Sequence, residues 1–60
     1  MPSDQTRRLL KVFGVAVTEF EDAVEEHRPP AEIAKAESEV RARLQEVTDL
    51  IERLSAKTRT

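Results

Sequence analysis

Apolar side chains recur every three or four residues along the first half of the chain, which is the spacing of one face of an α-helix. The pattern predicts a helix over residues 4–27, with Ser3 suited to cap its amino end and Asp4 favourable in its first turn. Its stripe is about 140° wide, more than one neighbouring helix can cover. It consists of two adjacent rows that share both phenylalanines: Leu9, Phe13, Ala16, Phe20 and Ala23 in one, and Leu10, Phe13, Val17, Phe20 and Val24 in the other.

A second apolar row follows the double proline Pro29-Pro30. Pro30 suits the first position of a helix, where no backbone N–H is needed, so the row predicts a helix over residues 30–57. Glu37 falls inside this row and must either turn outward to Arg41 or find a partner on another chain. The row has coiled-coil spacing and contains Ile33, Val40, Leu44, Val47, Ile51 and Leu54.

Only residues 28–29 remain for the turn, so the two helices must fold back on each other in antiparallel order. The expected fold is therefore all-α, a single helical hairpin over residues 1–60. Counting outward from the turn pairs Val24 with Ile33, Phe20 with Glu37, Phe13 with Leu44, and Leu9 with residues 47–50.

A hairpin of this kind leaves half of the first helix's stripe in water, and an exposed apolar patch of that size normally marks an interface. The chain has 60 residues and no cysteine, so no disulfide adds to a small core. A second copy would close the stripe with two-fold symmetry as a four-helix bundle, and we expect a homodimer or a higher homo-oligomer. The residues expected at this interface are Leu9, Leu10, Phe13, Gly14, Val17, Phe20, Val24, Ile33, Val40, Leu44, Val47, Ile51 and Leu54.

Three residues of the first helix allow two interpretations each. Gly14 costs about 1 kcal/mol relative to alanine in a helix, and it either lets a partner helix approach closely or is simply tolerated. Val12 and Val15 are expected to point away from the main stripe. They are either ordinary exposed residues or a contact for a different, larger protein.

Charge adds little to this picture for the whole chain, but it is uneven along the first helix. Twelve acidic and ten basic residues give a net charge of −2, which favours neither nucleic acid nor an anionic membrane as partner. Residues 1–15 carry three basic and one acidic residue, a net +2, whereas residues 16–28 carry one basic and five acidic, a net −4. Either these charges are merely solvated, or the first helix packs antiparallel on its own copy.

Candidate chemistry is sparse. His27 follows Glu25 and Glu26, but Val24 stands three residues before it, so the Glu-x-x-His spacing of carboxylate metal sites is missing and a capping role is favoured. One histidine, one glycine and no cysteine supply neither a nucleophile beside a base nor a phosphate loop. We therefore expect no enzyme activity, no cofactor and no metal.

The expected function is a non-enzymatic protein–protein interaction module, such as a small accessory, adaptor or regulatory subunit that self-associates. An alternative is an obligate subunit, similar in role to an antitoxin or chaperone, whose first helix packs on a different protein. A weaker alternative is nucleic-acid binding through terminal basic residues. The apolar run 12–17 is too short to span a membrane and the amino end lacks the order of a signal peptide, so we expect a cytoplasmic protein. The terminal basic residues are Arg7, Arg8, Lys11, Lys57 and Arg59.

Overall fold

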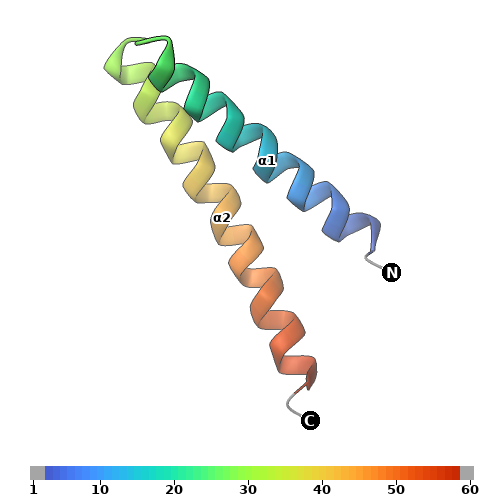
Figure 1. Cartoon of the computed structure of the whole chain (residues 1–60). Helices are drawn as coiled ribbons and strands as arrows, with labels where there is room; N and C mark the ends of the chain where they lie inside the picture. The colour runs from blue at the N-terminus through green and yellow to red at the C-terminus, as the bar shows by residue number, and fades with distance from the viewer. Residues whose placement is uncertain (1–2, 59–60) are drawn as a thin grey trace.

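The computed structural model describes residues 3–58, which form two helices joined by a short turn (Figure 1). Helix α1 spans Asp4–Glu25 and helix α2 spans Pro30–Thr58. The helices lie side by side at the turn and diverge toward the two termini (Figure 1). The radius of gyration is 14.4 Å, against about 10 Å for a compact chain of this length. The predicted all-α helical hairpin is confirmed, in an elongated and open form.

The amino end of α1 is capped as its sequence predicts. The Ser3 hydroxyl accepts a hydrogen bond from the backbone N–H of Thr6 at 3.1 Å, and its oxygen lies 3.0 Å from the Thr6 hydroxyl. Asp4 stands in the first turn, where its negative charge lies at the positive end of the helix dipole. The start of α1 is therefore fixed by short-range chemistry at Ser3.

The carboxyl end of α1 comes earlier than expected, at Glu25 instead of residue 27. His27 adopts a left-handed backbone conformation, with a φ of 54°, which ends the helix. Its N–H donates to the carbonyl of Val24 at 3.2 Å, and the N–H of Arg28 donates to the carbonyl of Ala23 at 3.1 Å. These two bonds define a Schellman motif, so His27 caps the helix through its backbone in a position that glycine usually occupies.

Helix α2 begins at Pro30, as expected, because the carbonyl of Pro29 accepts the first free N–H groups of the helix. Glu32 and Ile33 donate to that carbonyl at 2.9 and 3.2 Å. At the other end α2 runs to Thr58, one residue beyond the expected boundary. With 29 residues against 22, α2 is the longer helix.

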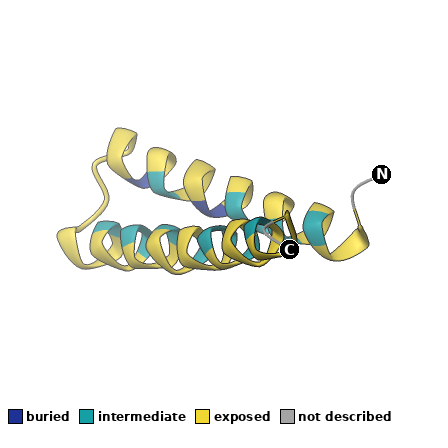
Figure 2. Ribbon diagram, turned by 90° about the horizontal axis from the view of Figure 1, so that it is seen from below, coloured by how far each residue is buried: buried dark blue, intermediate teal, exposed yellow. Residues whose placement is uncertain are grey.

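The contact between the helices is shallow. Of the residues that the structure describes, only Ala16 and Ala23 are buried, and both lie on the side of α1 that faces α2 (Figure 2). Half-buried apolar side chains surround them. The first of the two rows on α1 therefore faces α2, whereas the residues that belong to the second row alone, Leu10, Val17 and Val24, are exposed. The half-buried apolar residues between the helices are Leu9, Val12, Phe13, Phe20, Ile33, Ala36, Val40, Val47 and Leu50.

Candidate interaction surface

Large apolar side chains are exposed along both helices. Among the described residues, seven of them keep between 39% and 57% of their surface accessible. This is a large apolar surface for a hairpin whose described part buries only two alanines. The seven are Leu10, Val15, Val17, Val24, Leu44, Ile51 and Leu54.

Most of these side chains lie on one side of the hairpin. Leu10, Val17 and Val24 are seven residues apart, and seven residues return a helix to within about 20° of the same direction, so they form one line along α1. On α2, Leu44 and Ile51 are likewise seven residues apart. We call this side, with Leu10, Val17, Val24, Leu44 and Ile51, the apolar side.

The other side of the hairpin carries an open groove of about 460 Å³ between the diverging helices, with charged residues from both helices in its lining. Val12 lines this groove, and the helical period places Leu10 about 160° around α1 from Val12, away from the groove. Leu44 is turned about 100° from Arg43, another groove residue. The groove is lined by Gln5, Arg8, Leu9 and Val12 from α1 and by Arg43, Glu46, Asp49 and Arg53 from α2.

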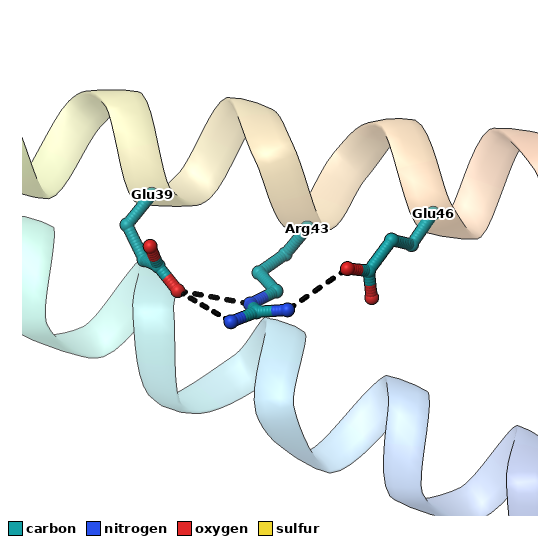
Figure 3. A network of polar contacts seen from close by, with 3 residues as sticks. All are labelled: Glu39, Arg43 and Glu46. Carbon is teal, nitrogen blue, oxygen red and sulfur yellow. Dashed lines mark hydrogen bonds and ion pairs between the residues drawn. The ribbon is translucent and has the colours of Figure 1, made fainter.

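Arg43 is the centre of an ion-pair network at the edge of this groove (Figure 3). Its Nε and Nη2 atoms lie 2.9 and 2.8 Å from Oε1 of Glu39, and its Nη1 lies 2.8 Å from Oε1 of Glu46. The hydrogen bond to Glu39 is the main cause that raises the pKa of Arg43, followed by the charges of Glu39 and Glu46. Both contacts join residues that are neighbours on the surface of α2, four residues apart for Glu39 and three for Glu46.

Val12 corrects one expectation. Instead of pointing away from the stripe, it is half-buried beside Leu9 in the groove, whereas Val15 is exposed. The reason is the rotation of α1 about its own axis. It turns Ala16 and Ala23 directly toward α2, so they are buried, whereas the two phenylalanines are only half-buried. Val12 lies only about 40° from Ala16 on the helical wheel, so it is drawn into the contact.

The residues expected at an interface fall into two groups. Six of the thirteen lie between α1 and α2 and are half-buried, so within one chain they hold the hairpin together. The other seven are exposed and open to a second molecule. The first group is Leu9, Phe13, Phe20, Ile33, Val40 and Val47. The second group is Leu10, Gly14, Val17, Val24, Leu44, Ile51 and Leu54.

Glu37 finds its partner within its own helix. Arg41 donates to Oε2 of Glu37 from Nε at 3.0 Å and from Nη2 at 2.7 Å. Of the two possibilities left by the sequence, the outward turn to Arg41 is therefore confirmed. The half-buried carboxylate carries its own counter-charge and does not require another chain.

Gly14 is exposed, and a Cβ atom built on it would have nothing within 4 Å. Its carbonyl accepts a hydrogen bond from the hydroxyl of Thr18 at 2.9 Å, an interaction open to any residue at position 14. The hairpin itself therefore gives no reason for a glycine at this position.

Comparison of the chain with protein-family models, with curated proteins and with solved structures finds no match. A helical hairpin as a fold serves many unrelated roles, so the function has to be inferred from the exposed residues of this hairpin.

Arg8, one of the terminal basic residues, lies near acidic residues in the groove. Arg8 and Arg53 line the groove together with Glu46 and Asp49, so positive and negative charges are mixed there. Arg59, part of the weaker nucleic-acid hypothesis, lies outside the described residues. The phosphate backbone of a nucleic acid would be attracted by the arginines of this groove and repelled by its carboxylates.

The single histidine, His27, directly follows two acidic residues, Glu25 and Glu26. Within residues 3–58, no group of three or more histidine, cysteine, aspartate or glutamate side chains could hold a metal ion. Neither α1 nor α2, as far as the structure describes them, combines the length and the apolar character needed to cross a bilayer.

Proposed function

We propose that this chain is a non-enzymatic protein–protein interaction module, a small accessory, adaptor or regulatory subunit that self-associates through the apolar side of its hairpin. The observation that carries the proposal is the accessible surface of 5033 Å². A folded monomer of 6.8 kDa has about 4,000 Å² of accessible surface. The excess of about 1,000 Å² matches the area of about 800 Å² that each partner buries in a stable complex.

The chemistry of the exposed surface fits this role. Burying a leucine, valine or isoleucine side chain contributes about 1.5–3 kcal/mol, and the apolar side holds five such residues in two lines. Ala16 and Ala23 supply little apolar area in the hairpin itself. Association would therefore supply most of the burial that a chain of this size needs. Two hairpins joined by their apolar sides form a four-helix bundle with a two-fold axis.

The first test is the absolute mass of the chain by light scattering across a dilution series, with helix content followed by circular dichroism. A dimer that dissociates on dilution is the expected result. A helical monomer at every concentration contradicts the proposal. A poorly helical or polydisperse chain supports instead the obligate-subunit alternative, in which a different protein covers the apolar side.

A matched pair of variants tests the surface. Val17→Glu places a charge in the middle of the apolar side and is expected to abolish the dimer. Val15→Glu makes the same change on α1, about 160° around the helix from Val17, and is expected to leave the dimer intact. Both valines are exposed in the hairpin, so neither change disturbs the contact between α1 and α2. Equal loss of the dimer in both variants would mean that the apolar side is not the interface.

A further inference from the structure

We infer that the two copies meet through α1 against α1 in antiparallel order, with Gly14 of each chain facing Val17 of the other. This inference rests on the proposed function, because it specifies how the proposed dimer is arranged.

Helix α1 carries a seam on its exposed face. Besides the row that contacts α2, it has a row with alternating spacings of three and four residues, which is the heptad spacing of a coiled-coil seam. Every member of this row is exposed in the hairpin. A second helix can therefore lie along it without displacing α2. The seam consists of Arg7, Leu10, Gly14, Val17, Glu21 and Val24.

Gly14 is the one position of the seam that has no side chain. A glycine in the middle of a helix costs about 1 kcal/mol, and within the hairpin a Cβ at this position would meet no atom within 4 Å, so crowding does not account for the glycine. A coiled-coil seam alternates between two heptad positions, a and d, and in an antiparallel pair of helices an a residue of one helix faces a d residue of the other. Gly14 and Val17 occupy different positions of this kind. Gly14 then leaves space for Val17 of the second copy, and the two-fold axis repeats this contact.

The charges along α1 favour the antiparallel order. Counting in opposite directions from the contact of Gly14 and Val17, Arg7 comes level with Val24 of the second copy, one helical turn from its Glu21, and Leu10 comes level with that Glu21. The positive half of α1 thus lies along the negative half of the other α1. In a parallel arrangement Arg7 would face Arg7, and Glu21 would face Glu21, so like charges would oppose each other. Charge therefore selects the antiparallel order.

Charge reversal tests this arrangement. Arg7→Glu and Glu21→Arg each bring like charges together at two symmetric places. Each is expected to weaken the dimer about tenfold, as measured by sedimentation equilibrium. The double variant restores opposite charges and is expected to return the dissociation constant to within about twofold of the original. Arg8→Glu, in the groove, is the matched control and is expected to have little effect.

Gly14→Leu gives a second readout that is independent of charge. Leucine favours helix more than glycine does, so circular dichroism is expected to show that the hairpin remains helical. Val17 of the second copy can no longer fit, and the dimer is expected to be lost. If Arg7→Glu, Glu21→Arg and Gly14→Leu all dimerise as tightly as the original chain, the arrangement is wrong and the proposed function stands. If the original chain is monomeric at every concentration, both are wrong.

Discussion

His27 occupies a backbone conformation that non-glycine residues seldom adopt. For an L-residue the left-handed region costs about 1–2 kcal/mol, because Cβ approaches the following carbonyl oxygen. Here the cost is offset by two capping hydrogen bonds, from the N–H groups of His27 and Arg28. Arg28 adds an ion pair to Glu26 at 2.9 Å, and its hydrogen bond to Glu26 is the main cause that raises the pKa of Arg28.

His27→Gly is therefore expected to stabilise the hairpin. Glycine adopts the left-handed conformation without the Cβ penalty, so the free energy of unfolding should rise by about 1 kcal/mol. Urea titration at a fixed protein concentration measures this free energy of unfolding. Glu26→Gly is the control, because Glu26 has a φ of −83° and gains nothing from glycine. A His27→Gly variant that is no more stable would show that the histidine ring makes a contact of its own.

Individual residues also show where sequence reasoning was sufficient. Ser3 and Pro30 fix the two helix starts by local chemistry, and both starts were predicted correctly. The end of α1 was placed two residues too late, because no glycine marks the left-handed position at His27. Val12 was misplaced because the rotation of α1 depends on which row packs on α2, and both rows contain the same two phenylalanines.

At the scale of the elements, pairs of charges along its own length add to the stability of α2. The described part of α2 has no fully buried side chain, so apolar contact with α1 holds it only in part. Glu37 with Arg41, and Glu39 with Arg43, are spaced four residues apart with the acid first, which is the favourable orientation. Arg43 differs from Arg41 because it binds a second carboxylate, that of Glu46.

Arg43→Ala is expected to lower the melting temperature and helix content of the chain about twice as much as Arg41→Ala, because two carboxylates lose their partner instead of one. Circular dichroism at low salt measures the difference. The gap between the variants should shrink in 1 M salt, where charges are screened beyond about 3 Å. Equal effects at low salt would mean that the contact of Arg43 with Glu46 contributes nothing in solution.

At the scale of the whole molecule, the divergence of the helices determines what one chain buries. Ala16 and Ala23 are buried, whereas the ends of both helices far from the turn are largely exposed to water. The molecule measures 48 × 19 × 13 Å. The sequence predicts the hairpin and its excess of apolar surface from periodicity. It does not predict the divergence, in which Ala16 and Ala23 are buried nearer the turn while Leu9 and Phe13, closer to the open end, are only half-buried.

Hydrogen exchange should reveal this uneven contact. In dilute solution, amide protection is expected to be highest around residues 16–23 and to fall toward the open end of the hairpin. At concentrations that favour the dimer, protection is expected to extend along α1 to residues 7–14, which the second copy would cover. Mass spectrometry of peptides at two concentrations measures both patterns. Protection that is uniform and independent of concentration would argue against assembly through α1.

The small size of the two side chains that are buried in the described part of the chain has a consequence for heating. The enthalpy of unfolding sets the width of a thermal transition, and the small side chains of Ala16 and Ala23 give up few packing contacts when the hairpin unfolds. A lone hairpin should therefore lose its helix signal gradually over a broad range of temperature. Two hairpins that cover each other's apolar sides have more area to release at once, and they should melt in a sharp transition with a large calorimetric enthalpy. The width of the thermal transition thus distinguishes a monomeric hairpin from a dimer.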